Sequence, residues 1–219
     1  MVSFENLRKD SEILAYIESA NNVLGQIGYT EHGMAHAVKT GEDASRILSS
    51  LGYDEHTCEL ARIAGLIHDI GNTVNRCDHA QSGAFLAFEL LRARGFDYKD
   101  VIEITTAVGH HDEKTAAPVT PIAAALILAD KADVRRSRVR NADASTFDIH
   151  DRVNYSVTSS ELILNDTHTH LTLKLTVDTH YSSVMDYFEI FLERMILCRK
   201  AADRLGLVFK LVINDQALI

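Results

Sequence analysis

The chain has 219 residues, of which 46% are hydrophobic, so it is long enough to bury a core and is typical of a globular protein. No apolar stretch approaches the roughly 18 uncharged residues of a membrane helix, and the charged N-terminal segment lacks the apolar run of a signal peptide, which favours the cytoplasm. A formal net charge of −9 argues against a general nucleic-acid-binding surface, and three scattered cysteines argue against disulfides and against cysteine-ligated zinc.

The first 140 or so residues predict a series of helices. Apolar spacing and terminal glycines predict helices over residues 5–27, 33–51, 54–69, 79–94, 98–110 and 119–138. In the third of these, the apolar residues face a core and Gly71 follows as a stop signal. His68 and Asp69 are therefore expected at the end of a buried helix.

The pattern changes to strands beyond about residue 145. Val153, Tyr155 and Val157 alternate with polar residues, and so do the residues of 171–177, so both segments predict half-buried strands. Between them, Asn165-Asp166 suits a hairpin turn.

A long helix and a last strand complete the chain. The helix is expected over about 184–205, closed by Gly206, and the strand over 207–213. The apolar stripe of this helix fits packing on its own sheet, and a homodimer formed through the stripe is the alternative. We therefore expect a mainly α fold, with a helical domain over 1–145 and, over 146–219, a small α+β appendage of antiparallel strands and one long helix.

Histidine has the most unusual distribution of any residue type. Seven of the 11 histidines fall between positions 32 and 111, interleaved with acidic residues. Adjacent side chains on a helix diverge by about 100°, so His68 and Asp69 suit two neighbouring metals, or one metal with Asp69 bridging to the next. Further ligand-type residues lie near the ends or inner faces of other predicted helices: His36, His79, His110, His111 and Asp130. Because a core is easier to build without such groups, a metal site is the better explanation.

In order and spacing, these residues resemble the HD-domain metal-dependent phosphohydrolases. The resemblance covers roughly residues 30–140 and is carried by His36, LIHDIGN around His68-Asp69, HAQSGAFLAFELL from His79, HHDE at 110–113 and ILADKAD ending at Asp133. It is greatest for the branch with the extended H…HD…H…H…D pattern, which includes HD-GYP phosphodiesterases and diadenosine-tetraphosphate hydrolases of the YqeK type. The resemblance implies an α-helical bundle around the metal site.

The same resemblance implies a site for two or three divalent metal ions. One ion would be held by His36, His68, Asp69 and Asp130, and a second by Asp69, His79 and His110. His111 and His32 match positions that serve an additional metal in some relatives, and for both the open alternative is a contact with the substrate or with a ligand. Imidazole and carboxylate ligands without thiolates suit iron or manganese, with zinc, cobalt, magnesium and nickel as alternatives.

Two departures from the family pattern argue against cyclic di-GMP as the substrate: Asn72 replaces the lysine of HD-GYP proteins, and no GYP follows HHDE. A basic run follows Asp130, and it contains Lys131, Arg135, Arg136 and Arg138. One interpretation is a solvated helix end stabilised by the helix dipole. The other assigns the three arginines to substrate binding, because a guanidinium offers planar bidentate donors to phosphate.

We therefore expect a phosphohydrolase acting on a small phosphorylated substrate, such as a nucleotide, with no nucleic-acid or membrane partner. Two cations about 3.5–4 Å apart would lower the pKa of a bridging water and offset charge in an in-line displacement. Asp69 would hold both cations, Asp133 would handle the proton, and Lys131 would orient the phosphate or the leaving group.

Two other functions remain open at this point. Some HD-fold proteins are diiron oxygenases, and phosphate release without oxygen would separate the two reactions. The chain could also be a non-catalytic nucleotide-binding regulatory module with the appendage as its working part, although the apparently complete ligand set argues against this. The appendage histidines, His150, His168, His170 and His180, are expected to be exposed and outside the site.

Overall fold

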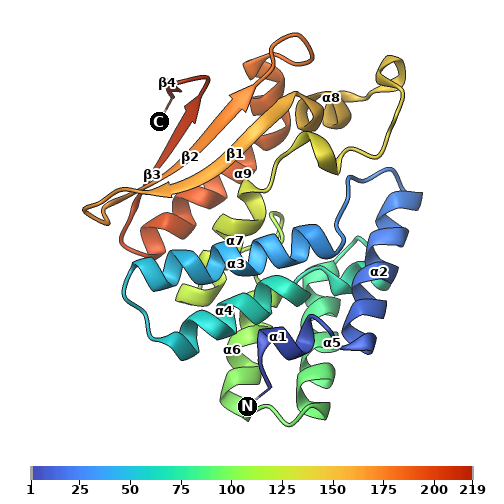
Figure 1. The fold of residues 1–219 in the computed structure, drawn as a ribbon, viewed down its shortest axis with the longest axis vertical. Coiled ribbons are helices and arrows are strands. Elements are labelled where there is room, and N and C mark those ends of the chain that lie inside the picture. The colour runs from blue at the N-terminus through green and yellow to red at the C-terminus, as the bar shows by residue number, and fades with distance from the viewer. Residues whose placement is uncertain (1, 219) are drawn as a thin grey trace.

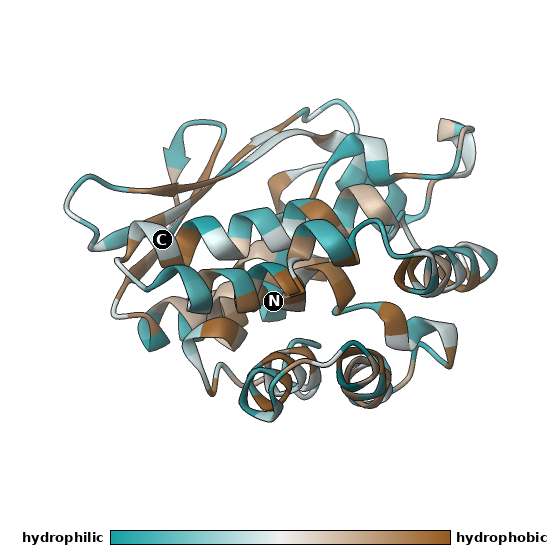
Figure 2. Ribbon diagram, turned by 60° about the horizontal axis from the view of Figure 1, so that its bottom comes forward, coloured by the Kyte–Doolittle hydropathy of each residue, from teal (hydrophilic) through white to brown (hydrophobic). Residues whose placement is uncertain are grey.

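Helices form one side of the molecule, and a four-stranded sheet with one long helix forms the other (Figure 1). A computed structural model describes residues 2–218. Seven α-helices come first within this range: α1 (Phe4–Leu7), α2 (Ser11–Gln26), α3 (Met34–Ser50), α4 (Glu55–Ile67), α5 (His79–Ala93), α6 (Tyr98–Gly109) and α7 (Pro121–Ala132). Hydrophobic and hydrophilic residues share the same helices (Figure 2), as expected where one face of each helix lies on a core.

The six predicted helices are present, with shifts at their ends. The first is divided in two, because the Asp10 side chain accepts from the backbone N–H groups of Glu12 and Ile13 and so begins α2. The last ends at Ala132 and not at residue 138, since the chain turns at Asp133 and continues as a short 3₁₀ helix, Arg136–Arg138. A second 3₁₀ helix, Ile70–Thr73, follows α4.

Helix α7 is the centre of the core. Its residues from Ile122 to Ala129 are buried, and α3, α4, α6 and α9 (Val184–Arg204) pack around it. Two glycines allow the close approaches that bring the surrounding helices together. A Cβ on Gly65 would lie 2.5 Å from Cα of Gly41 on α3, and one on Gly71 would lie 2.0 Å from the backbone oxygen of His79. Gly71 thus holds the end of the α4 segment against the start of α5, which places His68, Asp69 and His79 near one another.

The C-terminal part contains α8 (Ile149–Ser156), β1 (Val157–Leu164), β2 (His170–Val177), α9, β3 (Val208–Ile213) and β4 (Gln216–Ala217). The prediction of a strand at Val153 and Tyr155 is wrong, because both lie on α8. Asp148 caps this helix through the N–H of Asp151, and Val153 packs into the core at a helical spacing of four from Ile149. The alternation begins only at Val157.

The sheet has the order β1-β2-β3-β4. The predicted hairpin is present: β1 and β2 are antiparallel, and the side chain of Asn165 accepts from the N–H groups of Thr169 and His170 in the turn. The prediction that the strands are antiparallel is wrong for one pair. Strands β2 and β3 are parallel, because α9 crosses from one to the next.

One hydrophobic core contains residues from both predicted domains, so the boundary at residue 145 stays a prediction. Within residues 2–218, no helix is both long and apolar enough to cross a membrane. The cytoplasmic location and the homodimer also stay predictions.

Candidate metal centre

The ends of five helical segments meet in a cluster of buried histidines and aspartates. His36 lies in the first turn of α3, and His68 and Asp69 follow α4. The cluster is completed by His79 at the start of α5, His111 just after α6, and Asp130 in the last turn of α7. All four histidines are buried, so nearly all their polar atoms must find partners within the protein.

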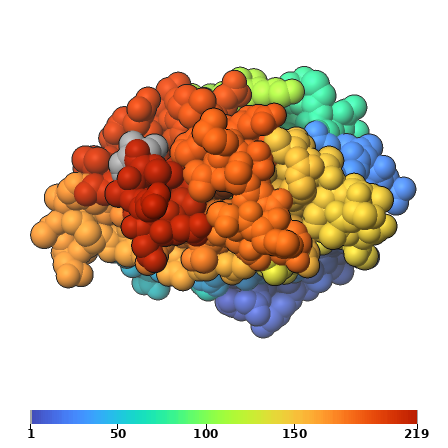
Figure 3. Space-filling view, turned by 90° about the horizontal axis from the view of Figure 1, so that it is seen from above, coloured from blue at the N-terminus to red at the C-terminus, as the bar shows by residue number. Residues whose placement is uncertain are grey.

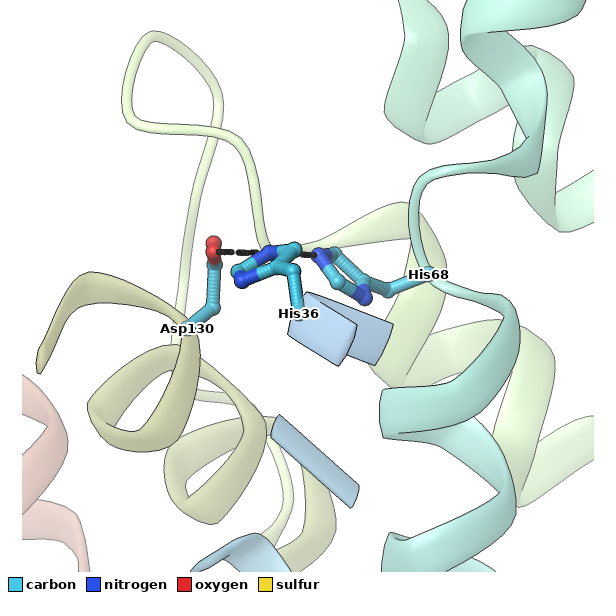
Figure 4. A group of neighbouring side chains, drawn as sticks. All are labelled: His36, His68 and Asp130. Carbon is cyan, nitrogen blue, oxygen red and sulfur yellow. Dashed lines mark hydrogen bonds and ion pairs between the residues drawn. The ribbon is translucent and has the colours of Figure 1, made fainter. Parts of the chain in front are cut away.

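The first candidate ion site contains His36, His68 and Asp130 (Figure 4). Nε2 of His36 lies 3.3 Å from Nε2 of His68 and 3.3 Å from Oδ1 of Asp130. Nε2 of His68 lies 3.7 Å from the same carboxylate oxygen. One ligand atom from each residue lies within 4.8 Å of the other two, so the three can hold one ion together.

The second candidate site contains His68, Asp69 and His111, whose ligand atoms also lie within 4.8 Å of one another. His79 belongs to this side of the cluster, because its Nε2 lies 3.2 Å from Nε2 of His111 and 3.5 Å from Oδ1 of Asp69. This arrangement offers imidazole nitrogens and a carboxylate at the distances that a second ion requires.

Asp69 lies between the two histidine pairs, with one oxygen toward each. Its Oδ2 is 3.3 Å from Nε2 of His68 and 3.8 Å from Nε2 of His36. Its Oδ1 faces Nε2 of His79 at 3.5 Å and Nε2 of His111 at 3.7 Å. The side chain is therefore placed to bridge two ions.

Hydrogen bonds on the outer side of the rings direct the free lone pairs into the cluster. Nδ1 of each histidine faces an oxygen acceptor: Asp133 Oδ2 for His36 at 2.8 Å, Gly65 O for His68 at 2.8 Å, Arg76 O for His79 at 3.1 Å and Val108 O for His111 at 2.6 Å. Because carbonyl and carboxylate oxygens accept and do not donate, Nδ1 carries the hydrogen and Nε2 is the available ligand atom. Ordered second partners of this kind are typical of metal-binding histidines.

The electrostatics of the cluster also fit a cation. Burial lowers the pKa of His68, but the carboxylates of Asp69 and Asp130 more than offset it and raise that pKa to about 10. Burial lowers the pKa of His79 to about 4, so this ring is neutral at pH 7. The carboxylates of Asp69 and Asp130 thus favour a positive charge at His68, and a metal ion bound there would have to displace the proton.

The family model of the HD domain matches residues 33–135. The sequence is 31% identical to a solved structure described as a predicted HD superfamily hydrolase from an uncultured Thermotogales bacterium, a match that covers 57% of this chain and 67% of that one. The chain therefore contains an HD domain, over residues 33–135. The TM-score of the match to the Thermotogales structure is 0.45.

Two curated relatives of the HD protein match over part of their length. An uncharacterised protein of Methanocaldococcus jannaschii is 24% identical over 159 residues, which are 63% of this chain and 61% of that protein. Ribonuclease Y of Opitutus terrae is 34% identical over 115 residues, which are 52% of this chain and 20% of that protein. The chain therefore matches less than two thirds of the length of each of these two relatives.

The HD protein brings His111, and not His110, beside Asp69 and His79. Helix α6 ends at Gly109 with His110 as its C-cap, and the next residue turns inward, where Nδ1 of His111 bonds to Val108 O. Nδ1 of His110 is buried and has no hydrogen-bond partner among the described residues. The structure thus places His111, and not His110, where the family resemblance implies a ligand of the second ion.

His32 directly precedes α3, whose N-cap is Gly33. Its ring still contacts that of His36 edge to face, at 5.4 Å between centroids, and its Nδ1 lies 2.7 Å from Thr30 O. His32 also lines the cavity described below. Its position therefore fits both alternatives: a ligand of an additional metal, or a contact with the substrate or with a ligand.

Asp133 lies behind His36 and is unsuited to proton transfer. Its carboxylate is buried, accepts from Nε of Arg135 at 2.7 Å and lies 2.8 Å from Nδ1 of His36. Burial alone would raise the pKa of Asp133, but the bonds from His36 and Arg135 hold it well below the ordinary value of 3.8. The structure thus places this residue as a support for His36, in contrast to the role expected from sequence.

A cavity of about 640 Å³ opens beside the cluster and is lined by Asp69, His79, His111 and Asp130. Of the basic run, Lys131 and Arg138 line it, whereas Arg135 bonds to Asp133 and Ser137, and Arg136 bonds to Tyr155 O. The assignment of Arg135 and Arg136 to substrate binding therefore does not agree with their positions.

Sequence reasoning missed several residues of the cavity wall. Arg76 lies three residues before His79, a position near enough to the HD motif to have been considered. His150 is exposed as expected but lines the cavity, and so do Phe191 and Arg194 of α9. No local pattern identifies these three, because only the tertiary fold brings them to the site.

Proposed function

We propose that this HD protein is a metal-dependent phosphohydrolase that cleaves a phosphoester bond of a small phosphorylated substrate, such as a nucleotide. The observation that carries the proposal is Asp69, whose two carboxylate oxygens face different histidine pairs at the wall of a cavity of about 640 Å³. A cavity of this size is in the range of small-molecule sites.

The charges of the cavity wall support a metal-dependent reaction. Seven acidic and five basic side chains line the cavity, a formal charge of −2 with neutral histidines. Such a wall repels a phosphate ester. Two divalent cations would change the formal charge to about +2, which suits a phosphate dianion.

The ion-holding residues would be His36, His68, Asp69 and Asp130 on one side, and Asp69, His79 and His111 on the other. When bound, divalent cations stabilise negative charge on a phosphoryl group and lower the pKa of a coordinated water. Nζ of Lys131 lies 2.5 Å from Oδ2 of Asp130 and lines the cavity, so it both orients this carboxylate and adds positive charge near the phosphoryl group. Asp133 fixes the ring of His36 from behind.

Two relatives support the class of reaction. One is described as a predicted hydrolase and one is named a ribonuclease, and ribonucleases act on phosphoester bonds. The net charge of −9 favours a small substrate over a polymeric nucleic acid for this chain. The composition of the ligand set favours iron or manganese.

The test is a measurement of bound metal and phosphate release on the same preparation. The protein is purified without oxygen, its metals are quantified, and phosphate release is followed across nucleotides and phosphomonoesters, with and without oxygen. We expect about two metal equivalents per chain and turnover that needs no oxygen, is abolished by a chelator and returns when metal is restored.

Three results would overturn the proposal. A protein that cannot be loaded with metal would contradict the ion sites. A loaded protein that releases no phosphate from any substrate would contradict the reaction. Turnover that depends on oxygen would favour the diiron oxygenase instead.

A further inference from the structure

Helix α9 reaches the cavity from outside the HD motif. The C-terminal segment, residues 146–219, contains α9 and covers much of one face of the molecule (Figure 3). Helix α9 packs against α7, which carries Asp130. Ile190, Phe191 and Arg194 of α9 line the cavity together with the candidate metal ligands. The C-terminal segment therefore contributes side chains to the site in addition to packing on it.

Two contacts fix the guanidinium group of Arg194. Its Cζ lies 4.1 Å from the centre of the Phe191 ring, and its Nε donates to Oε1 of Glu113 at 2.7 Å. The ring and the carboxylate together hold the group in place. A guanidinium held in this way loses less conformational entropy when it binds a ligand.

A chain of charged contacts connects Arg194 to the candidate metal centre. Oε1 of Glu113 lies 3.6 Å from Nζ of Lys131, which is 2.5 Å from Oδ2 of Asp130. Glu113 thus contacts both cations and keeps them on the Asp130 side of the cavity.

Arg194 has donors left for a ligand. Among the hydrogen bonds of residues 2–218, its Nε is used, whereas neither Nη1 nor Nη2 is. Arg138, in contrast, gives Nε to Glu31 O and Nη1 to Asp133 O. Free Nη groups on a planar cation match a pair of phosphoryl oxygens.

Carboxylates from another element also line the cavity. They belong to Asp148 and Asp151, at the N-terminal end of α8. Carboxylates repel a phosphoryl group and accept hydrogen bonds from hydroxyl and amino groups. Arg194 and the two α8 carboxylates together therefore suit a substrate that has an anionic end and a neutral, hydrogen-bonding end.

We propose that Arg194 binds a phosphoryl oxygen of the substrate, and that the substrate is a phosphate ester whose alcohol part, rich in hydroxyl or amino groups, lies against α8. This proposal rests on the proposed function, because it requires a phosphorylated substrate. It makes the C-terminal segment a determinant of substrate specificity.

The test compares Arg194→Gln and Arg194→Lys with the wild type, all loaded with metal, and uses Arg199→Gln as the matched control. Arg199 lies on the same helix and is exposed. Calorimetry measures the Kd for inorganic phosphate, and kinetics measure KM and kcat with the best phosphoester found in the screen. Metal content and Tm are measured for each variant.

We expect Arg194→Gln to weaken phosphate binding and raise KM by about tenfold or more, with metal content unchanged. Arg194→Lys keeps the charge beside Glu113 and lacks the planar Nη pair, so it should fold normally and still bind phosphate several-fold more weakly than the wild type. Arg199→Gln should match the wild type.

Two results together would overturn the role of Arg194. The lysine variant would have a phosphate Kd and a KM within twofold of wild type, and the glutamine variant would either give the same result or fail to fold. A wild-type loaded protein that neither binds phosphate nor hydrolyses any phosphoester would overturn the proposed function, and this inference with it. Wild-type hydrolysis with unaffected Arg194 variants would overturn only the inference.

Discussion

Oδ2 of Asp133 lies 2.8 Å from Nδ1 of His36, the ring nitrogen opposite the one that faces Asp130. Asp133 thus determines which nitrogen of His36 carries the hydrogen and how the ring is turned. A carboxylate in this position raises the basicity of the ligand nitrogen, and its loss typically costs 10- to 100-fold in metal affinity.

Asp133→Asn is therefore expected to weaken binding of the ion at His36 by about 10- to 100-fold, while kcat at saturating metal stays near that of the wild type. Metal titration of the apoprotein checks this, with turnover measured across the titration and circular dichroism as the control for folding. Unchanged metal affinity with a large loss of kcat would instead support the proton-transfer role expected from sequence.

The two neighbouring histidines after α6 give a matched pair of variants. His111→Gln removes a nitrogen that lies 3.2 Å from Nε2 of His79, so it is expected to lose about one metal equivalent. His110→Gln is expected to keep its metals, because His110 does not line the cavity within the described residues. Metal analysis of both proteins decides between the positions, and the reverse result would restore His110 as the ligand.

The limits of the sequence prediction can be traced to particular residues. Apolar periodicity and helix-ending glycines located the helices that carry His36, His68, His79 and Asp130, because these signals are local. The choice between His110 and His111 depends on how the backbone turns after Gly109, and adjacent residues in such a turn point in different directions.

Helix capping explains one other difference, and a tertiary contact explains another. Val153, Tyr155 and Val157 alternate like a strand, but Ile149 and Val153 also fit a helix, and the Asp148 cap favours the helix over so short a run. The sequence could not assign Arg194 to the site. The apolar stripe of α9 predicts only the helix, and the contact of Arg194 with Glu113 joins segments that are far apart in the sequence.

Arg136 is expected to stabilise the fold without affecting the reaction. Its guanidinium lies 4.4 Å from the ring centre of Tyr155 and 5.2 Å from that of Tyr181, and its Nε donates to Tyr155 O at 2.7 Å. Arg136→Gln should lower the free energy of unfolding by about 1 kcal/mol. Metal content and KM should equal those of the wild type. A raised KM would instead support the assignment of Arg136 to substrate binding.

The ion pair between Asp10 and Arg94 predicts a pH dependence of stability away from the metal centre. Asp10 accepts from Nη2 of Arg94 at 2.6 Å and from Nε at 3.0 Å, and the bond from Arg94 is the main cause that lowers the Asp10 pKa below 3.8. A lowered carboxyl pKa stabilises the folded state above the unfolded-state pKa, and this contribution is lost as the pH falls toward the folded-state value.

Asp10→Asn keeps an oxygen to cap α2 but loses the ion pair. We expect it to lower the free energy of unfolding by about 1 kcal/mol at pH 7, with the difference from wild type shrinking as the pH falls below about 4. Urea unfolding of both chelator-treated proteins at pH 7 and pH 3 measures this. A difference that is the same at both pH values would contradict the ion-pair explanation.

Asp69→Asn tests the bridging position most directly. The change preserves shape and volume but removes the negative charge and one anionic oxygen, so the fold should be retained. Two nearby cations repel each other, and the anionic oxygens that face both histidine pairs reduce this repulsion. The variant is expected to lose at least one metal equivalent per chain and about 10²-fold or more in turnover, roughly 2.7 kcal/mol in the barrier. Retention of every metal and of normal turnover, with native circular dichroism, would show that Asp69 does not bridge two ions.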